Sequence, residues 1–231
     1  MVTIALPPNE AQLVRKVPLF DGLDDDAIAW VAANLKRRHF RRNEVVYHTE
    51  DMPGSVYIVL SGRLKLQLQS PGGKHLTMGW IYPGSFFGTI SLLDGHERIA
   101  DAVAVEPSDL LVLARDNFRD FLRRYPHQAE VLLEITAARW RNTLRRLAEQ
   151  SFLDVPGRLA KTLLEARGSS DASVESATFA IRQTELAAMV GTSRETIGRW
   201  LKTFADAGLI EFTRGHITVL NREALARHVR W

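Results

Sequence analysis

The chain of 231 residues contains no cysteine. That absence excludes disulfides, thiolate zinc sites, iron–sulfur clusters and cysteine nucleophiles. The sequence also lacks a run of about 18 apolar residues, which a membrane-spanning helix would need. Its first residues carry neither the charged region nor the long apolar region of a signal peptide, so we expect a cytoplasmic protein with no membrane partner.

A strong excess of charge of one sign is missing as well. The net charge is +3, which is compatible with a nucleic-acid partner but does not require one. A composition of 45% hydrophobic and 25% charged residues is typical of a globular protein. The length is sufficient for one large or two modest domains, each with its own core.

The first half of the sequence has the pattern of short β-strands. Apolar residues alternate with polar ones on both sides of a Ser-Pro-Gly-Gly turn at 70–73, which predicts a β-hairpin with one buried face. The alternating positions are Leu64, Leu66 and Leu68 before the turn, and Leu76, Met78 and Trp80 after it. Further short strands at 45–48, 56–60, 102–105 and 110–114 favour a small barrel or roll over a parallel sheet.

The pattern becomes helical after residue 117, and residues 126–152 predict one long helix with an apolar seam. The seam residues follow one another at spacings of 4, 3, 4 and 3: Leu133, Ala137, Trp140, Leu144 and Leu147. This is the repeat of a two-stranded coiled coil, although a helix docked on its own β domain is an alternative. We favour a homodimer because arginines occupy the flanks of the seam at 139, 141, 145 and 146.

Residues 152–158 predict the end of that helix and the start of another. Asp154 suits the N-cap of the new helix, and Pro156 suits its first turn, where a missing N–H is tolerated. We therefore expect a domain boundary and a hinge here. A polar stretch at 168–173 predicts a loop further on.

Residues 184–204 have the pattern of a helix-turn-helix. The first helix runs over 184–191 with Thr184 as its expected cap, and small Ala187 allows a second helix to cross closely. Gly191 supplies the turn, and Ser193 with its neighbour Thr192 caps the second helix. The second helix, at 194–204, is expected to bury Ile197, Leu201 and Phe204.

The other face of that second helix is suited to reading DNA. Arg194, Glu195 and Arg199 are the expected base-reading residues, because arginine can donate twice to guanine and glutamate can accept from cytosine. Four residues are expected to contact the phosphate backbone: Ser193, Thr196, Lys202 and, at the tip of a predicted wing over 208–219, Arg214. The alternative is an ordinary helical hairpin with a solvated charged face.

With these motifs, the chain resembles the CRP/FNR family of bacterial transcription regulators over nearly its whole length. The resemblance rests on residues 84–88 (GSFFG), 152–155 (FLDV) and 191–199 (GTSRETIGR). It implies an α+β protein: an N-terminal β-roll (a double-stranded β-helix like cyclic-nucleotide-binding domains), a long dimerisation helix and a C-terminal winged helix-turn-helix. The corresponding domains are 1–126 for the β-roll with its N-terminal helices, 127–153 for the dimerisation helix and hinge, and 154–231 for DNA binding.

The resemblance also implies a target sequence. Arg194, Glu195 and Arg199 occupy the positions of the base-reading residues in the cyclic-AMP receptor branch, whereas the FNR branch has a serine at the place of Gly198. We therefore expect an inverted repeat with half-sites like TGTGA rather than TTGAT. Double-stranded DNA, a second copy of the chain and RNA polymerase are the implied partners.

The resemblance also implies an effector pocket in the β-roll. Members that bind cyclic AMP hold it with a glycine and a glutamate, an Arg-Ser pair, and a Thr-Ser pair on the dimerisation helix. This chain keeps Gly88, Arg98 and Thr143 but has Thr89, Ile99 and Leu144 at the other three positions. Cyclic AMP is thus a candidate effector that Thr89 and Ile99 disfavour, because polar partners are missing. Another small anion, an apolar molecule and the absence of any ligand are the alternatives. Taken alone, Arg98 would be interpreted as a solvated surface residue.

Two other functions stay open at this stage. A cyclic-nucleotide-binding regulatory module without a DNA role would explain residues 40–126 but not the helix-turn-helix. A haem-based gas sensor would use one histidine as an axial ligand, with these candidates: His39, His48, His75, His96 and His127. We do not expect an enzyme, because no spacing of nucleophile, base, phosphate loop or metal ligands exceeds chance.

Overall fold

A computed structural model describes residues 13–69, 75–166, 178–213 and 216–229. The chain separates into two compact units, Met1–Ala138 and Arg139–Trp231, so the long helix α5 contributes to both. The expected loop at 168–173 and Arg214 lie outside the described residues. None of the helices in the described ranges combines the length and apolar character that a membrane crossing needs.

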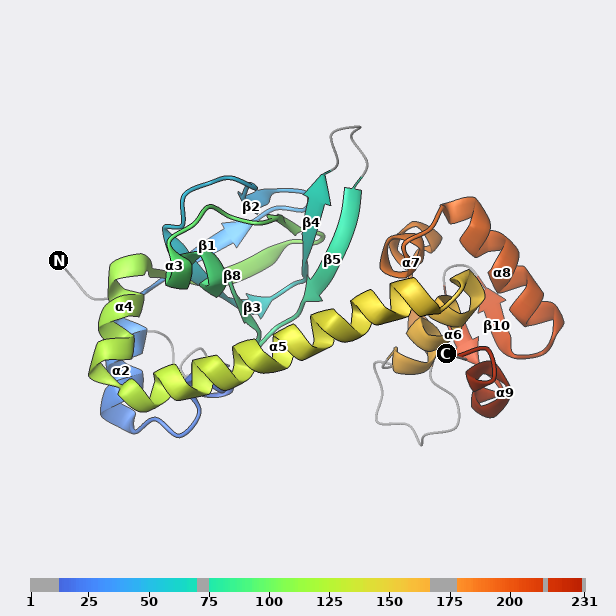
Figure 1. Cartoon of the computed structure of the whole chain (residues 1–231). Coiled ribbons are helices and arrows are strands. Elements are labelled where there is room, and N and C mark those ends of the chain that lie inside the picture. Colours follow the sequence, from blue (N-terminus) through green and yellow to red (C-terminus); the bar gives the residue numbers. More distant parts are fainter. Residues whose placement is uncertain (1–12, 70–74, 167–177, 214–215, 230–231) are drawn as a thin grey trace. The chain divides into compact units, whose positions relative to one another are not determined.

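The first unit is a β-roll with helices at its ends (Figure 1). Its elements, in chain order, are η1 (Pro18–Phe20), α2 (Asp25–Asn34), β1 (Leu35–Phe40), β2 (Val45–Tyr47), β3 (Ser55–Ser61), β4 (Leu64–Gln69), β5 (His75–Ile81), β6 (Phe86–Phe87), α3 (Thr89–Asp94), β7 (Asp101–Ala104), β8 (Ser108–Ala114), α4 (Arg115–Arg124) and the first part of α5 (Pro126–Phe152). The strands form two antiparallel sheets in the orders β1-β8-β3-β6 and β2-β7-β4-β5. The predicted roll is confirmed.

Two cores hold this unit together. One fills the inside of the roll between the sheets, with Phe40, Tyr57, Leu64 and Leu110 among its buried members. The other joins the outer face of β3 and β8 to α2, α4 and the start of α5. There the ring of Trp30 stacks on Phe121 at 6.4 Å, and Figure 1 shows α2 and α4 together at one end of the roll.

The β4–β5 hairpin forms as predicted. Its expected apolar face is confirmed at Leu64, which is buried, and at Leu66, which packs against the core of the roll, but it is wrong at Leu76 and Met78. A register shift lies between Leu66 and Gln67, and such a bulge reverses which side chains face the core. Gln67 is therefore buried and reaches the carboxylate of Asp101 at 3.5 Å. Leu76 and Met78 are instead 41% and 42% exposed.

The second unit contains the end of α5 and the winged helix-turn-helix. Its other elements are α6 (Val155–Glu165), β9 (Thr178–Ala180), α7 (Gln183–Val190), α8 (Arg194–Asp206), β10 (Ile210–Thr213), β11 (His216–Val219) and α9 (Arg222–Ala226). The wing is a three-stranded sheet in the order β10-β11-β9. One apolar core joins α6, α7, α8, the wing and α9.

Two helix starts in this unit can be compared with the sequence. Asp154 caps α6 as predicted, since its Oδ1 accepts from the backbone N–H of Gly157 at 2.9 Å. The prediction that Thr184 caps α7 is wrong. The N-cap is Arg182, whose backbone N–H donates to the Glu185 carboxylate at 3.4 Å. Glu185, at the third position of the helix, accepts from the N–H of the N-cap residue, which is one of the two hydrogen bonds of a capping box.

Candidate nucleic-acid interface and effector pocket

Helix α8 begins at a hydroxyl-capped turn. The Ser193 Oγ accepts from the backbone N–H of Thr196 at 3.2 Å, and the two hydroxyl oxygens lie 3.1 Å apart. Before this cap, Gly191 has a positive φ of 73°, and its N–H donates to the carbonyl of Ala187 to close α7. A residue with a side chain is strained in this conformation, so Gly191 sets the tight turn between the two helices.

The buried face of α8 holds the helix in place. Ile197, Leu201 and Phe204 are each at most 1% exposed, as predicted, and they pack in the core of the second unit. Ala187 of α7 is 5% exposed, which is consistent with close packing of the two helices. A fixed helix of this kind presents its outer side chains in a defined direction, as base reading requires.

The exposed face carries the charged residues that the sequence singled out. Arg194, Glu195, Arg199 and Lys202 are all exposed. The Arg199 guanidinium donates to the Thr196 hydroxyl at 3.3 Å, so Thr196 orients an arginine as well as lying at the cap. The pKa of Glu195 lies below its usual range, because the carboxylate accepts from the backbone N–H of Glu195 itself and from the Ser193 hydroxyl. The ionised carboxylate remains a hydrogen-bond acceptor.

The end of α5 is held against the helix-turn-helix at the turn between α5 and α6. Leu153 is buried, and Arg158 donates from Nη1 to the Leu153 carbonyl at 2.7 Å and from Nε to the Val190 carbonyl at 2.9 Å. Lys161 of α6 also pairs with Glu149 of α5. These contacts fix the last turns of α5 to α6 and α7.

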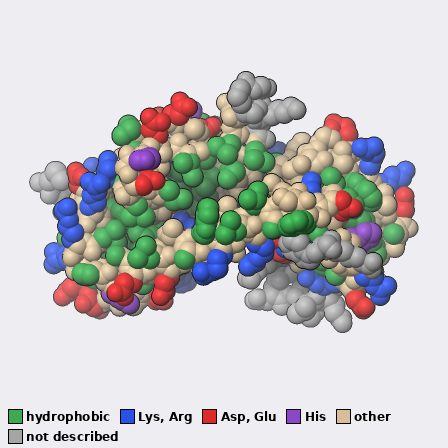
Figure 2. All heavy atoms as spheres, viewed as in Figure 1, with side chains coloured by type: hydrophobic (Ala, Val, Ile, Leu, Met, Phe, Trp, Pro, Cys, Tyr) green, Lys and Arg blue, Asp and Glu red, His purple; other side chains and the backbone are tan. Residues whose placement is uncertain are grey.

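Helix α5 exposes the whole apolar seam in the single chain. The predicted bounds of 126–152 are confirmed, and the seam residues are all exposed: Leu133 (69%), Ala137, Trp140 (62%), Leu144 (46%) and Leu147 (60%). Figure 2 shows apolar side chains at the surface along the middle of this helix. Such a contiguous apolar stripe is a feature of surfaces that another protein covers.

Arg98 is the central residue of the candidate effector pocket, and the interpretation of it as a solvated residue is wrong. It is only 4% exposed. Its Nη1 and Nη2 donate to the carbonyls of Gly88 and Ser55, both at 2.6 Å, and its guanidinium lies 4.3 Å from the centre of the Tyr47 ring. Within the described part of the chain, its buried Nε has no hydrogen-bond partner.

The other predicted pocket residues differ in their surroundings. Thr89 is 2% exposed and directly follows Gly88, whose φ is +85°. Ile99 is 61% exposed, in contrast to the buried Arg98 before it, so its side chain does not enclose the guanidinium. Thr143 lies on α5 in the second unit, where its hydroxyl donates to the Arg139 carbonyl at 3.0 Å.

Sequence reasoning missed the aromatic wall around Arg98. The rings of Tyr47, Tyr57 and Phe87 lie 5.2–6.0 Å apart, centre to centre. Burial raises the pKa of Tyr47 to about 12, against the opposing effect of the Arg98 cation, so its phenol stays neutral at physiological pH. The tyrosines on adjacent short strands were a signal in the sequence, but their convergence depends on the pairing of strands across the roll.

The candidate haem ligands do not lie in a common enclosed site. Among the described side chains, His39, His48, His96 and His127 are exposed. His39 and His127 contact the carboxylates of Asp109 and Glu130 at 3.1 and 3.0 Å. The side chain of His75 lies outside the described residues.

A β-roll, a long helix with an apolar stripe and a winged helix-turn-helix with a charged outer face together define a DNA-binding regulatory protein. Comparison with known families agrees: the model of the cyclic nucleotide-binding domain matches residues 37–125, and that of the Crp-like helix-turn-helix domain matches residues 157–228. The second match leaves no place for a regulatory module without a DNA role.

Known proteins are similar to this chain over nearly its whole length. The CRP-like cAMP-activated global transcriptional regulator of Mycobacterium tuberculosis is 31% identical over 223 residues, covering 95% of this chain and 99% of the relative. The cyclic AMP receptor protein of Thermus thermophilus is 35% identical over 207 residues, covering 90% and 93%. This chain belongs to the CRP/FNR family of DNA-binding transcription regulators.

Solved structures show the same fold. The Thermus thermophilus catabolite activator protein is similar with a TM-score of 0.54 and 33% identity, covering 92% of this chain and 98% of that one. The global regulator CLP of Xanthomonas campestris has a TM-score of 0.74 at 22% identity, covering 85% of this chain and 99% of that one. At that identity the second likeness concerns the fold alone.

Proposed function

We propose that two copies of this chain form a homodimer that reads an inverted repeat with TGTGA-like half-sites. The observation that carries the proposal is the exposed row of Arg194, Glu195 and Arg199 on a helix whose start is capped and whose other face is buried. An arginine can donate to both O6 and N7 of guanine, and a glutamate can accept from N4 of cytosine. Guanine and cytosine are both present in a TGTGA half-site with its complement.

Contacts to phosphate then set the register of the helix on the duplex. Ser193, Thr196 and Lys202 surround the start and outer face of α8, where hydroxyls, N–H groups and a cation favour phosphate. Arg214, between β10 and β11, is proposed to reach the backbone from the wing. Because Thr196 also holds Arg199, we assign it to both roles.

The exposed seam on α5 supports the dimer. Pairing of two α5 helices covers Leu133, Trp140 and Leu147, which are otherwise 60–69% exposed. A dimer that reads an inverted repeat places its two reading helices about 34 Å apart, in successive major grooves. In this arrangement residues 1–126 sense, 127–153 dimerise and 154–231 bind DNA.

The β-roll is proposed to hold a small anionic effector at Arg98. A guanidinium that is 96% buried and retains a buried Nε without a partner favours an anion more than a neutral ligand. Cyclic AMP is the effector named for the two relatives above, and it is one candidate here. Its affinity would be lowered because Thr89 offers no carboxylate to a ribose hydroxyl, and each lost partner costs about 1–3 kcal/mol.

The output of the regulator is proposed to pass through RNA polymerase. An effector acts in this scheme only if it binds the DNA-competent state more tightly than the other state. The contacts that fix the end of α5 to α6 and α7 then carry a change in helix pairing directly to the reading helices.

Fluorescence anisotropy with defined duplexes tests the half-site. We expect tighter binding to an inverted TGTGA repeat than to an inverted TTGAT repeat, measured over a series of spacings, with affinity falling as salt rises. Adding cyclic AMP in a parallel series measures the dependence on that effector. Equal affinity for both repeats at every spacing would refute the assignment of Arg194, Glu195 and Arg199.

A further inference from the structure

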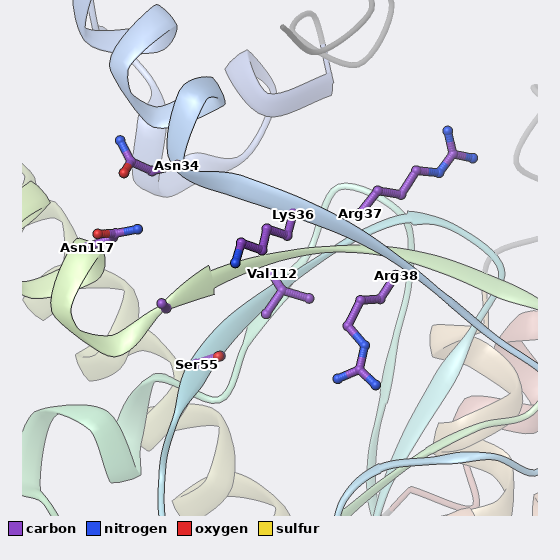
Figure 3. Close-up of a pocket in the computed structure, with 8 residues that line it drawn as sticks. Asn34, Lys36, Arg37, Arg38, Ser55, Val112 and Asn117 are labelled. Carbon is purple, nitrogen blue, oxygen red and sulfur yellow. The ribbon is translucent and has the colours of Figure 1, made fainter. Parts of the chain in front are cut away.

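A second recess lies in the first unit, formed by β1, β3, β8 and the start of α4. Its volume is about 390 Å³, within the range of small-molecule sites. The side chains that matter for its chemistry are Asn34, Lys36, Arg38, Ser55, Val112 and Asn117 (Figure 3). None of the described residues that line it is acidic.

Two cations flank the recess. Lys36 and Arg38 are two residues apart on β1, so both side chains leave the same face of the strand, on either side of Val112 (Figure 3). Both are exposed, and neither makes an ion pair with any described residue. Arg37 also borders the recess, but its guanidinium pairs with the Asp109 carboxylate at 3.1 Å.

Uncharged donors complete the lining. Asn117 lies in the first turn of α4, and Ala114, the N-cap of that helix, borders the recess as well. No side chain caps this helix, and its first N–H, that of Arg115, donates to the Gly54 carbonyl at 2.9 Å. The neighbouring carboxylate of Asp116 is not part of the lining.

We propose that this recess binds a small phosphorylated molecule, with a diphosphate or polyphosphate group between Lys36 and Arg38. Two separate cations with no carboxylate among the lining residues fit an anion with charge spread over several oxygens. A recess, in contrast to a flat basic face, favours a compact ligand over a nucleic-acid backbone or a protein surface.

The proposed anion site adjoins the effector pocket, and the Arg38 cation opposes the effect of burial on the pKa of Tyr57 in the aromatic wall of that pocket. Ser55 lines the recess, and its carbonyl oxygen accepts from Arg98 at 2.6 Å. The two anion sites therefore share one residue of β3.

Calorimetric titration of the full-length protein with inorganic pyrophosphate tests the proposal. We expect one saturable site per chain, and at least tenfold weaker binding in the double variant K36Q/R38Q. The matched control is R41Q/R42Q, which removes the same charge from exposed arginines on the same chain segment outside the recess. The control is expected to bind pyrophosphate within about twofold of the unchanged protein, as screening makes distant surface charges contribute little.

Three results would overturn the proposal. These are no saturable binding to the unchanged protein, equal weakening in both double variants, and unchanged binding in K36Q/R38Q. A fourth measurement separates a protein-docking role: if K36Q/R38Q loses transcription with purified RNA polymerase while the unchanged protein shows no pyrophosphate binding, the surface serves a protein partner. Circular dichroism confirms that both variants fold, which is expected for exposed side chains.

Discussion

Arg199 and Thr196 act as one unit at the start of the reading helix, since the hydroxyl accepts from the guanidinium at 3.3 Å. Replacing Arg199 with Ala should relax the preference at one base pair by about 1–3 kcal/mol, because a doubly donating contact to guanine is lost. Binding to duplexes with single substitutions measures this. Lys202→Ala is the control and should weaken all these duplexes alike, with a salt slope smaller by about one. A loss spread evenly over all positions in the Arg199 variant would contradict base reading.

Asp101 gives the β-roll a dependence on pH. Burial alone would raise its pKa, but the backbone N–H and hydroxyl of Thr49, at 2.7 and 3.0 Å, and the amide of Gln67 outweigh burial and lower it. A lowered pKa in the folded state adds stability above the unfolded value of about 3.9, and this stability is lost as the pH falls through the folded value.

The exchange of Asp101 for Asn tests that dependence. The variant should be less stable than the unchanged protein by about 1–3 kcal/mol at neutral pH, because the Thr49 donors lose an ionised acceptor. Urea unfolding at several pH values should show the difference in stability between the two proteins narrowing below about pH 4. There the carboxyl group begins to be protonated in the unfolded chain while it is still ionised in the folded protein. A gap that stays constant down to the lowest pH at which the protein folds would refute the role of the charge.

The residue scale also shows where sequence reasoning fails. The charged row on α8 could be predicted because it needs only a helical period and a cap. The burial of Arg98 could not, because its partners are carbonyls of Gly88 and Ser55, 10 and 43 residues away in the chain. No local pattern reports contacts of that range.

Gly198 gives a prediction at the scale of a single helix. It lies inside α8, and a Cβ added there would meet the Gln183 Oε1 at 3.6 Å, an ordinary contact. The exchange of Gly198 for Ala should therefore stabilise the protein by about 0.5–1 kcal/mol, measured by thermal or urea unfolding. If DNA affinity falls while stability rises, the role of Gly198 is to allow close approach of the helix to the duplex. A loss of stability would contradict the expectation that α8 accommodates a Cβ at this position.

Helix α5 gives a second prediction at this scale. Leu144→Glu places a charge in the seam and should weaken both self-association and DNA binding by about tenfold or more, since an unpaired charge opposes burial. Asn142→Glu adds the same charge to an exposed position off the seam and should leave both unchanged. Sedimentation and anisotropy measure the two effects, and intact binding by a monomeric variant would contradict the dimer.

Helices and strands could be predicted where one helical or alternating pattern of apolar residues continues without interruption. They were mispredicted where that pattern is broken. The bounds of α5 follow from an uninterrupted helical pattern over 126–152. The exposed face of β5 did not follow from simple alternation, because Leu66 pairs with Gly79 and Gln67 with Thr77. The bulge therefore falls at Met78, beside Gly79, and a glycine inside a strand was the one local signal for it. The start of α7 was misplaced because its N-cap is Arg182, a residue type that does not mark a helix start, whose N–H is bound by Glu185 three residues later.

At the scale of the whole molecule, a reading head and a sensor are joined by one long helix. The head carries the row of charged residues expected of a reader of TGTGA, whereas the sensor differs from the expectation for cyclic AMP in Thr89 and Ile99. The structure adds a buried Arg98 with aromatic walls and a separate basic recess around Lys36 and Arg38. Both features support the proposal that small anions bind to the β-roll.

Selection of bound sequences from a pool of random duplexes, with and without cyclic AMP, tests the central claim most directly. The account predicts an inverted repeat of TGTGA-like half-sites whose centres lie about one helical turn, or 34 Å, apart. Selected sequences should bind less tightly as salt rises. Recovery of TTGAT-like half-sites, of single unpaired half-sites or of no common sequence would contradict it.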